Sequence, residues 1–188
     1  GFCLVGSEMC IRDRIKRIKE RLGLKKHLNC EEPIWIHAVS VGEVKVAVLL
    51  VKELKKIFSD SNFLVTTSTV TGSNEVTKSF GSEVAHQYLP YDLNGVIKKF
   101  LINLNPKCLI LVETEIWPNL ISNCKKAEIP LILLNGRMSE KSLSNYQKFP
   151  KFFHKIFSKL DLVVAQSAGD LENFKRLGVG SKIITEDY

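Results

Sequence analysis

The chain has 188 residues, enough for one domain with a substantial buried core. Hydrophobic residues make up 45% of the chain and charged residues 25%, which excludes a wholly disordered protein. The net charge is +7, and one short segment near the amino terminus accounts for most of it, so the body of the domain is nearly neutral.

The first fourteen residues read GFCLVGSEMCIRDR and have neither an initiator Met nor the layout of a signal peptide. The run GSEMCIRDR resembles the translation of a transposon-type sequencing adapter. We therefore interpret residues 1–14 as a sequencing-adapter artefact and leave them out of the functional argument. The alternative is a natural, weakly structured terminus.

Residues 15–30 carry six Lys or Arg side chains and one acid, Glu20, and are predicted to form a basic helix. Ile15, Ile18 and Leu22 would share one face of it. The helix has either a solvated basic face or a surface that meets an anionic membrane. Nucleic acid is not predicted as a partner, because no aromatic residues interleave the basic ones. No run of about eighteen apolar residues occurs, so no membrane-spanning segment is predicted.

From Pro33 onward, short apolar runs alternate with amphipathic segments. The predicted strands are 34–38, 63–67, 84–89, 108–112, 131–134 and 162–165. The predicted helices are 44–58, 96–101, 120–127 and 171–177. Near-continuous apolar strands that alternate with helices are typical of a Rossmann-like α/β domain with a doubly wound parallel sheet. Such sheets bind ligands beyond the carboxyl ends of their strands, so the functional residues are expected there.

The first strand leads directly into the clearest helical pattern through Ser40, Gly42 and Glu43. Ser40 and Glu43 have the spacing of a capping box, and this structural role alone could explain both residues. Gly42 is expected to permit a tight turn and to leave room for a substrate. In the functional interpretation, Glu43 is a general base that removes a proton from an acceptor hydroxyl.

The fourth strand ends in Glu113 and Glu115, followed by Trp117 and Asn119. Two carboxylates directly after an apolar strand are unusual and indicate a site. We expect Glu113, Trp117 and Asn119 to contact substrate. The structural alternative is that Glu115 only begins the next helix and that Trp117 belongs to the core.

The fifth strand is followed by Arg137, whose guanidinium suits a phosphate or the carboxylate of an acidic sugar. A surface ion pair with Glu140 or Asp170 is the alternative role for this side chain. Together with Ser40 and Gly42, Arg137 completes the set of residues predicted to bind substrate.

Several classes of site are not predicted. The dinucleotide motif G-x-G-x-x-G and the P-loop motif are both missing, which argues against a nicotinamide enzyme and a P-loop NTPase. The cysteines have no CxxC spacing, and the four histidines form no metal-ligand pattern with each other or with acids. We therefore expect reduced thiols, no metal and no cofactor. His37 and His86 are interpreted as core or rim residues.

Six runs in this order and spacing resemble the amino-terminal domain of Kdo (3-deoxy-D-manno-octulosonic acid) transferases: IWIHAVSVGE, LVTTSTVTGS, YLPYDL, ILVETEIWPN, LLNGRMSEKS and VVAQS. The resemblance covers roughly residues 33–177. It implies a glycosyltransferase-B fold, in which residues 31–188 form the acceptor-binding half and a carboxyl-terminal donor-binding domain is missing from this chain. It also implies transfer with inversion from the co-substrate CMP-Kdo to the lipid A precursor lipid IVA, without a metal.

The resemblance implies that the Glu of the S-V-G-E motif is the base, which falls on Glu43. It also implies a catalytic role for the second Glu of E-T-E-x-W-P-N, which falls on Glu115. Gly136 stands where the family usually has Ala, a change expected to be tolerated. Val70 replaces a frequent Pro, so the roles of residues 69–73 are less well defined by the resemblance.

The resemblance further implies a location at the cytoplasmic face of the bacterial inner membrane, with residues 15–30 as the basic segment beside an anchor that is absent here. The chain alone is then expected to bind acceptor weakly and to transfer nothing. Two other functions remain open. One is a stand-alone Rossmann-like module for an anionic ligand, and the other is a glycosyltransferase that uses a nucleotide-diphosphate sugar.

Overall fold

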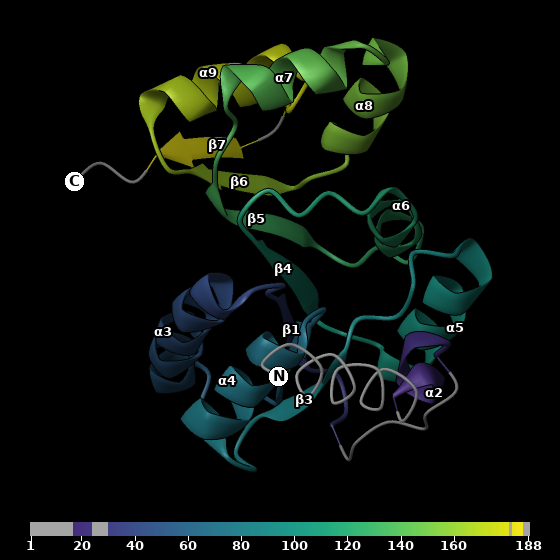
Figure 1. The fold of residues 1–188 in the computed structure, drawn as a ribbon, viewed down its shortest axis with the longest axis vertical. Helices are drawn as coiled ribbons and strands as arrows, with labels where there is room; N and C mark the ends of the chain where they lie inside the picture. The colour runs from purple at the N-terminus through teal and green to yellow at the C-terminus, as the bar shows by residue number, and fades with distance from the viewer. Residues whose placement is uncertain (1–16, 24–29, 181, 186–188) are drawn as a thin grey trace, which may run out of the picture.

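The computed structural model describes residues 17–23, 30–180 and 182–185, and residues 1–14 lie outside these ranges. Its centre is a seven-stranded parallel sheet in the order β3-β2-β1-β4-β5-β6-β7 (Figure 1). The strands are β1 (Ile34–His37), β2 (Phe63–Thr67), β3 (Ala85–Tyr88), β4 (Cys108–Val112), β5 (Leu131–Gly136), β6 (Leu162–Ala165) and β7 (Lys182–Thr185). The predicted doubly wound α/β fold is confirmed.

The helices are α2 (Ile18–Arg21), α3 (Val41–Ile57), α4 (Val70–Phe80), α5 (Asn94–Leu104), α6 (Pro118–Lys126), α7 (Glu140–Gln147), α8 (Pro150–Phe157) and α9 (Ala168–Arg176). All four predicted helices are present. The sequence patterns did not reveal α4, α7, α8 or β7. The apolar stripe of α4 is short, because the small residues Gly72 and Ser73 fill buried positions that larger apolar residues would mark.

The helices cover the two faces of the sheet in two groups. The apolar core on one face includes Val44 and Val51 of α3 and Val76 of α4, and the larger core on the other face contains side chains of α5 to α9. In Figure 1, α3 and α4 lie on the left, and α5, α6 and α8 lie on the right. The chain changes faces where β1 and β4 pair, so this boundary is the topological switch point, where such folds bind ligands.

The described part of the basic segment is docked on the edge strand β3. The buried Glu20 carboxylate accepts a hydrogen bond from the backbone N–H of Tyr88 at 3.1 Å. The guanidinium of Arg21 donates to the carbonyl of Ser68 at 2.9 Å and stacks on the Tyr88 ring at 4.6 Å. Arg21 therefore has a structural role. No helix among the described residues is long and apolar enough to cross a membrane.

Candidate active site

The turn from β1 into α3 holds Glu43 in a fixed orientation. The side chain of Ser40 accepts a hydrogen bond from the backbone N–H of Glu43 at 3.4 Å, and the Glu43 carboxylate accepts from the N–H groups of Val39 at 2.7 Å and Ser40 at 3.1 Å. The predicted capping box is therefore present. Each carboxylate oxygen keeps a second lone pair, so the cap orients Glu43 without preventing it from accepting a proton.

Gly42 is not required by the backbone at this turn. Its φ is not positive, and a Cβ atom added there would meet only the Ser40 Oγ at an ordinary 3.8 Å. The expectation of a tight glycine turn was wrong, because Gly42 lies in the first turn of α3 with ordinary helical geometry. The space above it is open, as a substrate contact would need.

The second loop at this edge packs closely on the first. The hydroxyl of Thr69, the N-cap of α4, donates to the carbonyl of Val39 at 2.8 Å. A Cβ atom at Gly72 would lie 3.0 Å from the same carbonyl. The TVTGS run therefore supports the loop that carries Glu43, which gives residues 69–73 a structural role.

The end of β4 has a strained backbone. Glu113 has a φ of 60°, a left-handed conformation that is uncommon for a residue other than glycine. Its N–H bonds the Leu134 carbonyl at 2.9 Å, so the conformation is held by the sheet. Strain of this kind clusters at functional sites. It places Glu113, Thr114 and Glu115 together around one hollow at the edge of the sheet.

Glu115 has the most perturbed carboxyl group of this edge. Burial raises its pKa above the usual value, and the negative charges of Glu43 and Glu113 raise it further. A hydrogen bond from the indole N–H of Trp117 at 3.1 Å acts in the opposite direction. The same charge of Glu115 adds to the effect of burial in raising the pKa of Tyr146 on α7. A carboxyl group with a raised pKa, close to a second carboxylate, is a candidate for proton transfer.

Trp117 connects this carboxylate to the core. It is the N-cap of α6, it is half-buried, and its ring lies 6.3 Å from that of His37. The imidazole of His37 is fully buried, and burial lowers its pKa to about 4, so the ring is neutral. Its Nδ1 lies 3.1 Å from the Thr66 carbonyl. The expectation that His37 belongs to the core is confirmed.

Asn119 has a structural role that the sequence did not reveal. Its backbone N–H and that of Leu120 donate to the Asp92 carboxylate at 3.0 and 2.7 Å. Its side-chain amide donates to the Asp92 carbonyl at 2.7 Å. Asp92, from the YLPYDL run, therefore caps α6 from a distant part of the chain. The amide N–H of Asn119 is already engaged, so its expected contact with substrate stays a prediction.

Arg137 presents its guanidinium to solvent at the same edge. Its backbone N–H and carbonyl both bond the hydroxyl of Thr114, which ties the β5 loop to the β4 loop. The alternative of an ion pair is not observed. Glu140 pairs with Arg176, while Asp170 accepts from the Met138 N–H. Within the described residues no acid pairs with the Arg137 side chain, which leaves it available to an anion.

The residues of this edge surround a hollow of about 620 Å³. It is lined by Glu113, Thr114, Glu115, Arg137, Ser139, Ser142, Gln166, Ser167 and Asp170. Ser139 and Ser167 are the N-caps of α7 and α9, so two helix amino termini, which favour anions, begin at its wall. The sequence identified the carboxylates and Arg137 but missed the serines, since cap residues occur at most helix starts.

Gly136, at the end of β5, is tightly enclosed. A Cβ atom there would lie 2.9 Å from the ring of the fully buried Phe174. The register between β5 and β6 also shifts between Leu133 and Gly136. In this chain an alanine at this position would require the Phe174 ring to move, while the expected tolerance of Gly136 in place of the family's Ala stays a prediction.

The chain resembles proteins of one enzyme family. A family model described as 3-deoxy-D-manno-octulosonic-acid transferase (kdotransferase) matches residues 16–186. Proteins named 3-deoxy-D-manno-octulosonic acid transferase from Haemophilus influenzae and Rickettsia bellii are 38% and 37% identical, over 94% and 90% of this chain. A bifunctional glycosyltransferase/methyltransferase of Fusobacterium nucleatum is 36% identical over 80% of this chain and 24% of its own length.

The chain spans 42% and 41% of the length of the first two relatives. The family match extends over nearly all the described residues, including both carboxylates and Arg137. The chain therefore belongs to the 3-deoxy-D-manno-octulosonic-acid transferase family.

Proposed function

We propose that this chain is the acceptor-binding part of an inverting glycosyltransferase that moves Kdo from CMP-Kdo to the lipid A precursor lipid IVA. The observation that supports this most is the charge interaction of Glu43 with Glu115 at the switch point of the sheet, where Glu115 lines the same hollow as Arg137. Family membership supports the choice of Kdo as the transferred sugar.

The reaction needs a base for the acceptor hydroxyl. As the hydroxyl oxygen forms a bond to the anomeric carbon of Kdo, the bond from that carbon to the CMP phosphate oxygen breaks, and the hydroxyl proton is lost. In this proposal Glu43 accepts the proton, which is supported by the burial of its carboxylate and its orientation by two backbone amides. CMP leaves with the bonding electrons.

Glu115 assists as the second carboxylate of the pair. A proton placed between two interacting carboxylates belongs to the pair rather than to one residue. The raised pKa of Glu115 therefore helps the site to retain the proton that the hydroxyl releases. Trp117 holds the Glu115 carboxylate in place through its indole N–H.

Among the residues that line the hollow, Arg137 is the cation that would bind a phosphate of the acceptor. The exposed guanidinium offers a pair of parallel donors to a phosphate group, and the amino termini of α7 and α9 add backbone N–H groups. Lipid IVA carries phosphates. The carboxylates of Glu43 and Glu115 would repel a phosphate, and Arg137 would hold that phosphate away from them. The proposed partners are thus lipid IVA, CMP-Kdo and an anionic membrane surface.

The test uses the full-length protein, with CMP-Kdo and lipid IVA as substrates. Glu43→Gln preserves the shape of the side chain but replaces the carboxylate, which can accept a proton, by an amide, which cannot. We expect a loss of about 10²–10⁴-fold in kcat, the usual contribution of a general base. Glu53→Gln on the same helix is the control, because Glu53 is exposed and, among the described residues, its side chain pairs only with Lys56. Near-normal turnover by Glu43→Gln would contradict the proposed base.

Donor choice distinguishes the alternative transferase. Replacing CMP-Kdo by UDP- or ADP-linked neutral sugars should abolish product formation by the full-length protein. Efficient transfer from one of these donors would favour a nucleotide-diphosphate sugar enzyme instead. Binding of lipid IVA without transfer from any donor would favour the stand-alone binding module.

A further inference from the structure

A second surface of the domain combines apolar side chains with unpaired positive charge. Helix α6 packs between α5 and α8 on the face of the sheet opposite α3 and α4 (Figure 1). The groove between α6 and α8, which we call the α6–α8 groove, has a volume of about 470 Å³. Its lining includes the apolar Phe152 and Ile156 and the basic Lys125, Lys126, Lys155 and Lys159.

The lysines of this groove lack acidic partners, with one exception. Lys125 pairs with Asp161 at 2.5 Å, and Lys159 donates to the hydroxyl of Ser122. Lys126 and Lys155 form no ion pair within the described residues. Burial lowers the pKa of Lys159, and the charges of Lys155 and Lys126 lower it further. The cluster therefore repels itself, and a bound anion would relieve that repulsion.

Large apolar side chains protrude beside these lysines. Phe149 and Phe152, at the start of α8, are 66% and 51% exposed. Leu93, the N-cap of α5, and Ile102 within α5 are 56% and 69% exposed. A basic helix with aromatic residues on its outer face is the pattern of a segment that lies in a membrane interface. A nucleic acid would make use of the lysines but would gain little from the aliphatic side chains.

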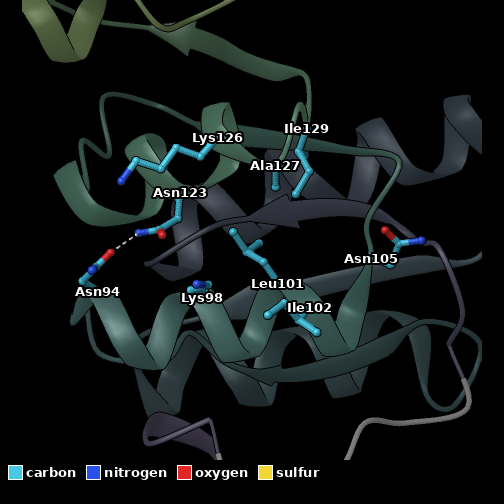
Figure 2. A pocket seen from close by; sticks show the side chains of 9 residues that line it. All are labelled: Asn94, Lys98, Leu101, Ile102, Asn105, Asn123, Lys126, Ala127 and Ile129. Atoms are coloured by element: carbon cyan, nitrogen blue, oxygen red, sulfur yellow. Dashed lines mark hydrogen bonds between the residues drawn. The ribbon is translucent and has the colours of Figure 1, made fainter.

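The groove continues towards α5. Lys126 also lines the neighbouring hollow between α5 and α6, of about 500 Å³ (Figure 2). In Figure 2, Leu101 and Ile102 of α5 lie below Ala127 and Ile129, with Lys98 and Lys126 at the same side of the hollow. The apolar floor and basic rim therefore extend over α5, α6 and α8.

We propose that this α5–α6–α8 face docks on a bilayer of anionic phospholipids. Phe149 and Phe152 enter the interface, and Lys126, Lys155 and Lys159 bind lipid phosphates. This deepens the membrane part of the proposed function, on which it rests, by assigning to the bilayer a surface of α5, α6 and α8. The described part of the basic segment adjoins this surface, since Gly23 lies against Val96 of α5, but its Arg21 is already engaged by Ser68 and Tyr88.

The position of this face suits a lipid-borne acceptor. Helix α6 begins at Pro118, next to Trp117, and ends at Lys126. At a rise of about 1.5 Å per residue, Lys126 lies about 12 Å along the helix from its start at the site. The proposed membrane face and the candidate active site therefore lie along the same helix.

The test is sedimentation of the chain with vesicles of phosphatidylcholine alone or with added phosphatidylglycerol. We expect binding only to the anionic vesicles. Lys126→Glu/Lys155→Glu should weaken it by about 25-fold or more, since each basic residue near an anionic bilayer strengthens binding about fivefold. The matched control is Lys45→Glu/Lys52→Glu, which reverses two exposed charges on α3, on the opposite face. The control variant should lose much less of its binding to the anionic vesicles.

A second variant, Phe149→Ser/Phe152→Ser, separates a bilayer from other polyanions. Both rings are exposed, so the fold should be retained, which circular dichroism checks. We expect reduced vesicle binding and unchanged retention on heparin. Three results would overturn the proposal: no binding of the unaltered chain to anionic vesicles, equal losses in the two lysine variants, or full vesicle binding by the phenylalanine variant. None of these measurements involves sugar transfer, so their failure leaves the proposed reaction untouched.

Discussion

Glu43 and Glu115 interact across the boundary between β1 and β4, although they are far apart in the sequence. Burial raises the pKa of Glu115, and the negative charge of Glu43 is the next contribution. The parallel pairing of β1 with β4 creates this relationship, because it places the carboxyl ends of both strands at one edge. The same pairing sets the α3 capping box beside the E-T-E run.

The raised pKa of Glu115 predicts a specific change in stability. The folded chain holds the Glu115 proton more tightly than the unfolded chain, so the ionised group destabilises the fold above its folded pKa. Glu115→Gln should therefore increase the urea midpoint at about pH 8, and the increase should vanish below about pH 4, where the unfolded carboxyl group is protonated as well. Urea unfolding at both pH values measures this.

The control for that experiment is Glu53→Gln, at an exposed position whose ion pair contributes little. A gain from Glu115→Gln of equal size at both pH values would mean that ionisation is not the cause. A loss at pH 8 would mean that the Glu115 carboxylate is needed for folding.

Because Asp92 caps α6, removal of its side chain should lower the stability of the fold. Asp92→Ala removes the acceptor of the N–H groups of Asn119 and Leu120. We expect a loss of about 1–2 kcal/mol in the free energy of unfolding, as for other helix caps. Urea unfolding measures it, with Asp60→Ala as the control, since the Asp60 side chain bonds only the exposed Ser59 among the described residues. Equal stability of both variants would show that the cap contributes nothing.

Tight packing at Gly136 predicts that alanine is unfavourable there. Gly136→Ala would press a methyl group against Phe174, and overpacking of this kind costs about 1–3 kcal/mol. Gly95→Ala is the matched control, because nothing lies within 4 Å of its added Cβ in helix α5. It should stabilise the chain by about 0.5–1 kcal/mol. The double variant Gly136→Ala/Phe174→Leu should recover part of the loss, and no recovery would exclude the ring as the cause.

The sequence predicted what depends on local pattern. Apolar runs identified six strands, and the S-x-x-E spacing identified the capping box at Ser40. Long-range pairing was not accessible in this way. Nothing in YLPYDL shows that Asp92 caps a helix from another part of the chain. That depends on α5 packing against α6, although the strands that precede them, β3 and β4, are separated in the sheet by β2 and β1.

Two further features depend on tertiary structure. The strand β7 has only two apolar residues, Ile183 and Ile184, and becomes a strand because β6 offers it a free edge. The left-handed backbone of Glu113 arises from its N–H bond to Leu134 and not from its own preference. By contrast, Asn135, which is also left-handed, is a residue type that accepts this conformation readily.

The unpaired guanidinium of Arg137 predicts a change in acceptor binding in the full-length protein. Arg137→Ala should raise the KM for lipid IVA by about 10- to 100-fold, because a hydrogen bond to a charged group contributes about 1.5–3 kcal/mol. The kcat should change less, since the guanidinium binds the acceptor and does not take its proton. Arg137→Lys should restore only part of the affinity, because an ammonium lacks the parallel donors of the guanidinium.

Arg176→Ala is the control for this prediction. Arg176 is the last residue of α9, its side chain pairs with Glu140 and Asn173, and it does not line the hollow. It should leave the KM nearly unchanged. If both arginine variants raised the KM equally, general loss of positive charge would explain the effect. If Arg137→Ala lowered kcat at constant KM, the guanidinium would act on the transition state rather than on the bound acceptor.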